Sequence, residues 1–294
     1  MEDAPTRREF VTRAAAGLAA VPLLGTGVAA AAGAPRRRLK KAVKLGMVKV
    51  EGSLLDKLKL VKALGYDGVE PGSPNGLDTA ELLAARDATG LEIHGVVDSV
   101  HWRKPFSHPD EAVRAEGVAA LRQAIQDAKD YGASTVLVVP AVVNKTIGYD
   151  EAWERSIVEI RKALPDAERA GVKLAFENVW NGFLLSPLEF ASYVDAFESP
   201  WVGAYFDIGN VIKFGWPEQW IRILGKRILK LDVKGYSHKE SFKAAIDEGD
   251  CDWAAVREAL AAIDYSGWAT AEVGGGGEER LRDIAARMDR ALGA

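Results

Sequence analysis

The stretch AERAGVKLAFEN, residues 167–178, joins the end of one helical segment to a short strand and shows the unit from which the chain is built. Gly171 stands where a glycine commonly ends a helix, and the apolar run of residues 174–176 is typical of a buried strand. Glu177 follows this run directly, before the chain has left the interior. A carboxylate is costly to remove from water unless something pairs with it, so the sequence predicts a partner for Glu177.

The same order of strand, loop and helix recurs along the chain. Helix starts are predicted at Asp110, which follows a proline, and at Ser186, which precedes one. Eight runs have the composition of strands, namely residues 43–48, 67–70, 91–97, 134–143, 172–178, 202–208, 227–234 and 268–273. Eight alternating units predict an α/β fold of one closed (β/α)8 barrel, the TIM barrel. A doubly wound open sheet is the alternative, but residues 48–56, VKVEGSLLD, lack the Gly-rich dinucleotide loop expected there.

The composition excludes several classes of protein. With 294 residues, 48% hydrophobic and 27% charged, the chain is typical of a globular protein with one large core. A formal net charge of −4 disfavours a nucleic-acid partner, which usually requires a basic surplus. The single cysteine, Cys251, excludes an intramolecular disulfide and a multi-cysteine zinc site, and four histidines are too few for a histidine-rich cluster.

The N-terminal segment differs in kind from the rest. The sequence TRREFV, residues 6–11, precedes a short apolar stretch rich in alanine, with Ala-x-Ala cleavage possibilities at its end. We predict a twin-arginine-type signal peptide in residues 1–34, a basic linker in residues 35–42 and the barrel domain in residues 43–294. A disordered or membrane-anchoring tail is the alternative, although the stretch is short for an anchor. The expectation is export to the periplasm by the twin-arginine route, without stable membrane insertion after signal removal.

Four successive strands end in a carboxylate. The apolar runs LAFE, AYFD, LKLD and ATAE end at Glu177, Asp207, Asp232 and Glu272. The carboxyl ends of barrel strands meet at one mouth, where four like charges would repel strongly. A hard divalent metal held by oxygen ligands is the simplest cation that would balance them. The sequence therefore predicts a metal as the partner of Glu177.

The segments FENVWN, YFDIGN, ILKLDVKGY and WATAEV, with the eight-unit layout, resemble the xylose isomerase-like barrel family over roughly residues 44–292. This family includes sugar and sugar-phosphate isomerases, 3-epimerases of ketoses, inosose dehydratases and endonuclease IV. In its epimerase branch a Glu, an Asp, a His and a Glu hold one Mn²⁺ or a similar ion, and the two glutamates transfer protons. The resemblance implies that Glu177, Asp207, Asp232 and Glu272 bind the metal, and that Glu177 and Glu272 are also catalytic.

Two positions depart from the pattern of that branch. Asp232 stands where the branch has histidine, and Asn210 ends a segment that reads Asp-x-x-His there. Xylose isomerase itself uses an all-carboxylate site, so Asp232 remains a candidate ligand. Without the two imidazoles the site favours Mn²⁺, with Mg²⁺ or Co²⁺ as alternatives, over Zn²⁺. The same departures count against endonuclease IV, whose zinc cluster requires several histidines.

Further residues near the predicted strand ends are candidates for binding a sugar. An imidazole or an amide can hydrogen-bond a hydroxyl, an indole can stack on a pyranose, and an ammonium can polarise a carbonyl. The candidates are His101, Asn178, Trp180, Asn210, Trp216 and Lys234. Each has an alternative interpretation. The alternative for His101 is an exposed loop residue, that for Trp180 and Trp216 is packing of the loops, and that for Lys234 is neutralisation of the carboxylates.

The segment GGGGEER, residues 274–280, lies where such barrels often bind phosphate, between the last strand and a helix. Glu278 and Glu279 would oppose a phosphate at that helix N-terminus, so we interpret the segment as a flexible turn with a helix start. A non-phosphorylated sugar is therefore the expected substrate.

Taken with the resemblance, these residues predict a metal-dependent sugar isomerase or epimerase that transfers a proton next to a carbonyl on a sugar or keto-sugar. A 3-keto-glycoside lyase or hydrolase of the same fold starts from the same proton abstraction and remains an alternative. A non-catalytic, exported sugar-binding barrel is the alternative from another class, motivated by the two missing histidines. The expected partner is a small carbohydrate; the oligomeric state is not predicted.

Overall fold

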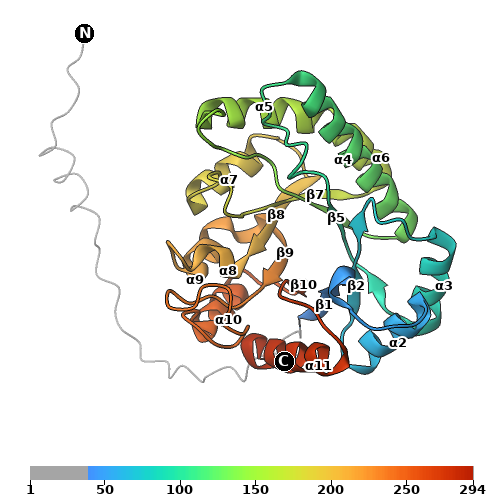
Figure 1. Ribbon diagram of the computed structural model, residues 1–294. Helices are drawn as coiled ribbons and strands as arrows, with labels where there is room; N and C mark the ends of the chain where they lie inside the picture. Colours follow the sequence, from blue (N-terminus) through green and yellow to red (C-terminus); the bar gives the residue numbers. More distant parts are fainter. Residues whose placement is uncertain (1–38, 294) are drawn as a thin grey trace, which may run out of the picture. The chain divides into compact units, whose positions relative to one another are not determined.

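A computed structural model of the chain describes residues 39–293, which form a barrel of parallel strands surrounded by helices (Figure 1). All nine strand pairings between its named strands are parallel. The strands are β1 (Lys40–Lys44), β2 (Gly68–Glu70), β3 (Gly72–Ser73), β4 (Glu92–Ile93), β5 (Val96–Asp98), β6 (Thr135–Val138), β7 (Lys173–Glu177), β8 (Val202–Asp207), β9 (Ile228–Val233) and β10 (Trp268–Ala271).

The sheet closes on itself through two interrupted strands. Its order is β3-β5-β6-β7-β8-β9-β10-β1-β2-β4. Pro71 alone separates β2 from β3, and His94 and Gly95 separate β4 from β5. β2 and β3 together form one strand position, and β4 and β5 together form the next one. These two positions are neighbours, because β2 pairs with β4 and β3 pairs with β5. The described chain therefore has eight strand positions in a closed ring, which confirms the predicted (β/α)8 barrel.

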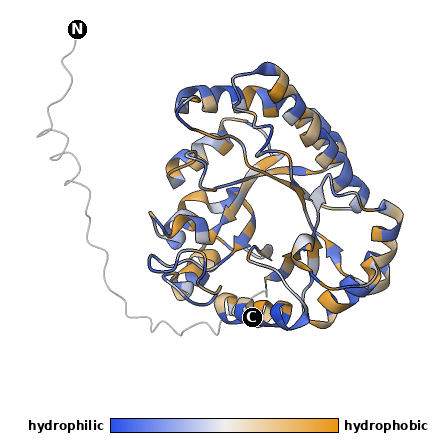
Figure 2. Ribbon diagram, viewed as in Figure 1, coloured by the Kyte–Doolittle hydropathy of each residue, from blue (hydrophilic) through white to orange (hydrophobic). Residues whose placement is uncertain are grey.

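Helices follow the strands and cover the outside of the ring (Figure 1). They are α2 (Leu54–Ala63), α3 (Thr79–Thr89), α4 (Glu111–Tyr131), α5 (Tyr149–Arg161), α6 (Leu164–Ala170), α7 (Pro187–Asp195), α8 (Ile208–Val211), α9 (Pro217–Leu224), α10 (Trp253–Ala262) and α11 (Glu278–Leu292), with 3-10 turns at Leu45–Met47 and Gly225–Arg227. Hydrophilic and hydrophobic residues alternate along them, as one solvent-facing and one core-facing side require (Figure 2). Among the described residues no helix is long and apolar enough to cross a membrane.

Local signals in the sequence set the ends of these helices. Asp110 accepts a hydrogen bond from the backbone N–H of Ala112 at the start of α4, and Ser186 caps α7 with a proline in the first turn. Gly171 follows α6 with a positive φ of 69°, a conformation that glycine adopts without strain. The predicted helix starts at Asp110 and Ser186 and the helix end at Gly171 are thus confirmed.

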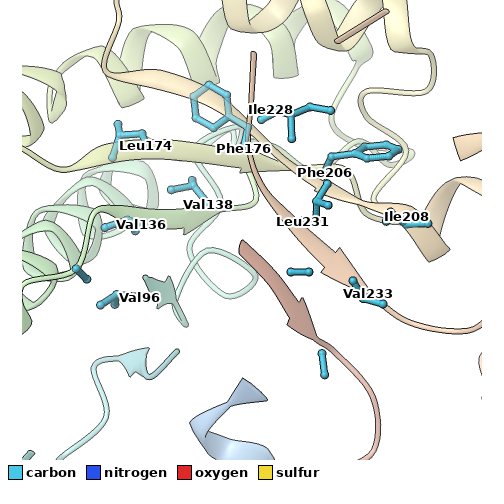
Figure 3. Close-up of a cluster of buried hydrophobic side chains, with 14 of the residues drawn as sticks. Val96, Val136, Val138, Leu174, Phe176, Phe206, Ile208, Ile228, Leu231 and Val233 are labelled. Carbon is cyan, nitrogen blue, oxygen red and sulfur yellow. The ribbon is translucent and has the colours of Figure 1, made fainter. Parts of the chain in front are cut away.

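The core lies between the strands and the helices. Alternate strand residues face opposite sides of the wall, and the set that includes Val136, Leu174, Phe176 and Leu231 faces the helices (Figure 3). Burying each of these side chains contributes roughly 1.5–3 kcal/mol. The residues between them face the barrel interior, so Glu177 points inward beside the outward-facing Phe176.

Three predicted boundaries need correction. The first strand begins at Lys40, three residues earlier than predicted, so the end of the segment interpreted as a basic linker belongs to the barrel. Its lysines suit a strand because Lys41 is buried against Asp289 while its backbone pairs with β10. The run at residues 91–97 is interrupted at His94 and Gly95, and the fourth strand stops at Val138. The predicted signal peptide, residues 1–34, lies outside the described residues.

Candidate metal centre at the barrel mouth

The structure brings together the four carboxylates that were predicted at the strand ends. Glu177, Asp207 and Asp232 lie at or next to the last residues of β7, β8 and β9, and Glu272 follows β10 directly. Asp207 and Asp232 are partners in the parallel register. Each of the four residues offers one carboxylate oxygen, and these oxygens all lie within 4.8 Å of one another. We call these four residues the carboxylate cluster.

The carboxylate cluster is largely removed from water. Asp207 and Asp232 are fully buried, Glu177 is buried, and the side chain of Glu272 is 31% exposed. Burial raises the pKa of Asp207 to about 6, and burial also raises the pKa of Asp232 well above its usual range. The pKa of Glu177 is raised by burial and then by the charge of Glu272. Asp232 Oδ1 has no hydrogen-bond partner among the described residues, so the cluster retains an unsatisfied acceptor.

Two lysines contact the carboxylate cluster from different elements. Lys44, the last residue of β1, places Nζ 2.9 Å from Asp232 Oδ2 and 2.5 Å from Glu272 Oε1. Lys234, which follows β9, places Nζ 2.8 Å from Asp207 Oδ2 and also contacts Glu272 Oε2. Burial alone would raise the pKa of Glu272, but the two ammonium groups lower it to about 2. The predicted neutralising role of Lys234 therefore has a geometric basis, whereas Lys44 was missed because it was counted only as a strand residue.

The two asparagines proposed as hydroxyl readers have other hydrogen bonds. The amide of Asn178 donates to Asp207 O and accepts from Asp207 N, at 2.9 Å each. Asn210 donates its amide to Asn178 O at 2.9 Å, and its backbone N–H donates to Asp207 Oδ1 at 2.7 Å. These bonds join the ends of β7 and β8 and hold the Asp207 carboxylate. Asn178 and Asn210 are therefore held against the strand ends that carry the cluster, and their predicted role in binding sugar hydroxyls stays a prediction.

The predicted aromatic residues differ in their surroundings. Trp180 donates its indole N–H to Asn210 O at 2.8 Å and is 42% exposed, with its ring centroid 4.7 Å from that of Phe242. Phe242 and Lys234 line a pocket of about 290 Å³ together with Glu272. Phe242 was missed by sequence reasoning, since nothing in its polar loop marks it. Trp216 is 64% exposed at the start of α9.

His101 is buried, so the surface-loop alternative is wrong. Its Nδ1 accepts a hydrogen bond from Val139 N at 3.3 Å, and its ring contacts that of Trp102 edge-on. Burial lowers the pKa of His101 to about 3, which keeps the imidazole neutral near pH 7. The structure therefore supports a neutral hydrogen-bonding residue at the end of the third strand position.

A second group of polar residues lies inside the barrel. The buried polar layer, as we name it, consists of Glu70, His94, Tyr205, Lys230 and Thr270. Tyr205 Oη donates to Glu70 Oε1 at 3.1 Å and lies 2.8 Å from Thr270 Oγ1, which in turn lies 3.2 Å from His94 Nε2. Lys230 Nζ lies 2.9 Å from His94 Nδ1. His94 is a buried core residue, and its ring stacks on that of Trp268.

The glycine run before α11 packs closely against the loop after β1. A Cβ at Gly275 would lie 2.2 Å from Met47 O, and Gly276 bridges to Val48. The N–H of Gly276 is bonded to Met47 O at 3.0 Å, and α11 begins with Glu278 and Glu279. The predicted helix start is confirmed. The middle of the turn is held by backbone contacts with the loop after β1.

Comparison with known proteins places this arrangement in a family. The model of the xylose isomerase-like TIM barrel family matches residues 58–291. The chain belongs to that family.

The curated relatives of this family member are sugar epimerases. L-ribulose-5-phosphate 3-epimerase UlaE of Escherichia coli O1:K1 is 31% identical over 176 residues, covering 53% of this chain and 59% of the relative. The corresponding protein of Salmonella paratyphi B has the same identity and coverage over 168 residues. The chain thus spans about three fifths of the length of these relatives.

Solved structures with the same fold include L-ribulose 3-epimerase, with a TM-score of 0.74 and 20% identity over 87% of this chain and 95% of the other. The 3-keto-D-glucoside 4-epimerase YcjR of E. coli has a TM-score of 0.73 and 16% identity, covering 87% of this chain and all of the other. D-allulose 3-epimerase from Methylomonas sp., in complex with D-allulose, has a TM-score of 0.71 and 18% identity, with coverage of 87% and 96%. At these identities the likeness shows the shared fold.

Proposed function

We propose that this chain is a sugar isomerase or epimerase that moves a proton at a carbon next to a carbonyl, with a divalent metal bound by the carboxylate cluster. The observation that carries the proposal is the convergence of four strand-end carboxylates within 4.8 Å, in a family whose curated relatives here are sugar epimerases. Four carboxylates that come this close repel one another, and a bound divalent metal would offset that repulsion.

The residues fit a hard divalent cation. All four side chains offer oxygen, the donor atom that Mn²⁺ and Mg²⁺ prefer, and Asp232 Oδ1 is a buried acceptor without a partner. Glu177, Asp207, Asp232 and Glu272 would hold the ion, for which we propose Mn²⁺, with Mg²⁺ or Co²⁺ as alternatives. When bound, the metal would supply Lewis acidity toward two adjacent oxygens of the sugar.

The protein's own groups would move the protons. Glu177 and Glu272 project from β7 and from the end of β10, which are separated by two strands in the ring. A sugar carbon between them could lose a proton to one carboxylate, and a proton returned by the other carboxylate to the opposite face of that carbon would invert it. Return of the proton to the former carbonyl carbon, with a proton passing from the hydroxyl oxygen to the carbonyl oxygen, would move the carbonyl instead. Lys234 contacts Glu272 and lines the pocket, so its ammonium is available to a substrate oxygen.

A non-phosphorylated sugar or keto-sugar is the substrate class that we propose. The acidic first turn of α11 and the closely packed glycine run disfavour a phosphate at the position where such barrels often bind one. The half-exposed rings of Trp180 and Phe242 offer apolar faces on which a sugar ring can stack. The name of UlaE specifies a phosphorylated sugar, so the substrate class that we propose for this chain differs from that of UlaE.

Hydrogen exchange would test the reaction. The purified chain, loaded with Mn²⁺, is incubated in D₂O with ketoses, 3-keto-glycosides and sugar phosphates, and deuterium at the carbon next to the carbonyl is measured by mass spectrometry. We expect metal-dependent incorporation into a non-phosphorylated substrate. Release of an aglycone would favour the lyase alternative, and exchange confined to sugar phosphates would contradict the substrate class. Sugar binding without any exchange would favour the non-catalytic barrel.

We also propose export by the twin-arginine route, which rests on residues 1–34 of the sequence alone. Replacing Arg7 and Arg8 by lysine should retain the protein in the cytoplasmic fraction, as immunoblotting of cell fractions would measure. Unchanged fractionation would contradict this route.

A further inference from the structure

Lys44 occupies an unusual place for a lysine in a barrel. It is the last residue of β1, and its register partner on β2 is Glu70. Its side chain is 16% exposed, and its Nζ lies 2.9 Å from an oxygen of the fully buried Asp232. The second contact, 2.5 Å to Glu272 Oε1, joins the first strand to the end of the last one. Lys44 is therefore a partly buried cation in direct contact with two of the four candidate metal ligands.

The net charge of the carboxylate cluster explains why the ammonium group of Lys44 lies beside it. Four carboxylates and two ammonium groups leave a formal charge of −2 when all are ionised. Without Lys44 the surplus would rise to −3 in a region of low dielectric, where like charges repel most strongly. Lys44 thus stabilises the cluster while no metal is bound. The same positive charge repels a divalent ion that approaches Asp232 and Glu272.

We propose that Lys44 is a built-in counter-ion that competes with the divalent metal for Asp232 and Glu272 and so weakens metal binding. The proposal rests on the metal-binding part of the proposed function. It assigns opposite effects to one side chain, because Lys44 stabilises the metal-free barrel and opposes loading of the metal. A residue with a purely structural role would favour both states.

Lys44 is a better test of this idea than Lys234. Lys234 lines the mouth pocket beside Phe242, so its replacement would also disturb the space available to a substrate. Lys40 provides a matched control on the same strand. Its ammonium pairs with Glu92 and lies over the ring of Trp268, away from the carboxylate cluster.

Mn²⁺ titration calorimetry on the wild-type chain, Lys44→Met and Lys40→Met tests the proposal, with thermal unfolding followed in EDTA and in excess Mn²⁺. Removing one positive charge beside the ion should tighten Mn²⁺ binding at least about tenfold in Lys44→Met and change it less than about twofold in Lys40→Met. The melting temperature of Lys44→Met should fall in EDTA, and its rise on adding Mn²⁺ should exceed that of the wild type. If Lys44→Met does not fold without metal, Lys44→Gln, which keeps a donor for Asp232 but removes the charge, takes its place.

The outcomes separate this proposal from the proposed function. Mn²⁺ binding by the wild type with equal or weaker binding by both Lys44 variants would overturn the role of Lys44 and leave the metal site standing. No Mn²⁺ binding by any of the proteins would overturn both. Tighter binding accompanied by a less stable metal-free state would support the counter-ion.

Discussion

The barrel contains two groups of buried ionisable residues that differ in how their charges are balanced. In the buried polar layer one carboxylate, Glu70, accompanies one amine, Lys230, and hydrogen bonds through Tyr205, Thr270 and His94 join the members. In the carboxylate cluster four carboxylates face two ammonium groups, and Asp232 Oδ1 has no hydrogen-bond partner in residues 39–293.

The two groups differ in whether the fold alone accounts for their charges. A buried polar group costs free energy unless its partners satisfy it, so an internally satisfied layer is explained by the fold alone. A surplus of negative charge at the end of the barrel that opens to a pocket is not explained in that way. It is consistent with the metal site that we propose for the four carboxylates.

Replacing either of the two glutamates that we propose as proton-transfer groups should have the largest effect. Glu272→Gln and Glu177→Gln remove a proton acceptor while keeping the shape of the side chain, so turnover should fall by about 10²–10⁴-fold. Glu92→Gln, at the opposite end of the barrel and paired with Lys40, is the control and should retain full activity. The measurement is the initial rate of isomer formation by each Mn²⁺-loaded protein, with circular dichroism to verify the fold. Full activity in Glu272→Gln would contradict the proton-transfer assignment.

Breaking the buried polar layer should affect stability and leave the metal site intact. Tyr205→Phe removes the hydroxyl that joins Glu70 to Thr270, and the loss of a hydrogen bond to a buried charged group costs about 2–3 kcal/mol. Urea unfolding measures this cost, and Mn²⁺ titration should give the wild-type affinity. A large loss of metal affinity in Tyr205→Phe would mean that the two groups of residues act as one.

Asp98 offers a carboxylate outside both groups. It is buried at the end of β5, its Oδ2 has no hydrogen-bond partner among the described residues, and burial raises its pKa to about 6 from 3.8. Between these values the folded chain binds more protons than the unfolded chain, so the free energy of unfolding falls as the pH rises through that window. Asp98→Asn should therefore gain about 2 kcal/mol relative to the wild type between pH 4 and pH 7.

Urea unfolding of both proteins at pH 4 and pH 7 measures this difference. Parallel changes in the two proteins would show that Asp98 does not titrate in this range. Such a result would also imply that its free oxygen has a partner in solution.

The identity of the ligand atoms should set the choice of metal at the mouth. Asp232→His would introduce an imidazole at the position where the epimerase branch of the family has one, and imidazole favours Zn²⁺ relative to Mn²⁺. We expect the ratio of Zn²⁺ to Mn²⁺ affinity to rise by about tenfold, measured by competition with a chelating dye. The corresponding change at Asp87, an exposed aspartate paired with Arg86, is the control and should not alter the ratio. Loss of all metal binding in Asp232→His would show that only a carboxylate can serve there.

The two tryptophans should differ in their effect on substrate binding. Trp180 packs against Phe242 beside the pocket, so Trp180→Ala should raise KM by about fivefold, in line with the loss of one aromatic contact of about 1 kcal/mol. Trp216 is more exposed and caps α9, and its replacement by alanine should change KM less than about twofold. Steady-state kinetics with the substrate found by deuterium exchange would decide. A larger effect at Trp216 would relocate the stacking surface.

Much of the fold could be predicted because its signals are local. Alternating apolar runs, glycines after helices and caps such as Ser186 depend on residues within a few positions of each other. The positions of Glu177, Asp207, Asp232 and Glu272 could be predicted as well, since the carboxyl ends of parallel strands share one edge of a closed sheet. The strand that begins at Lys40 could not, because a run of basic residues is ordinarily exposed and only the partners of those lysines allow it in the barrel wall.

By itself, then, the sequence determined a barrel of eight units with four carboxylates at its mouth. Only the tertiary structure decided which cations meet those carboxylates and which amides are already bonded. Lys44 and Asp232 are 188 positions apart and come together because β10 pairs with both β1 and β9, so the carboxyl ends of these strands lie at one mouth. The amides of Asn178 and Asn210 look available in the sequence, but the neighbouring strand ends supply their hydrogen bonds. Side-chain pairing across a closed sheet depends on distances in space, which local spacing does not contain.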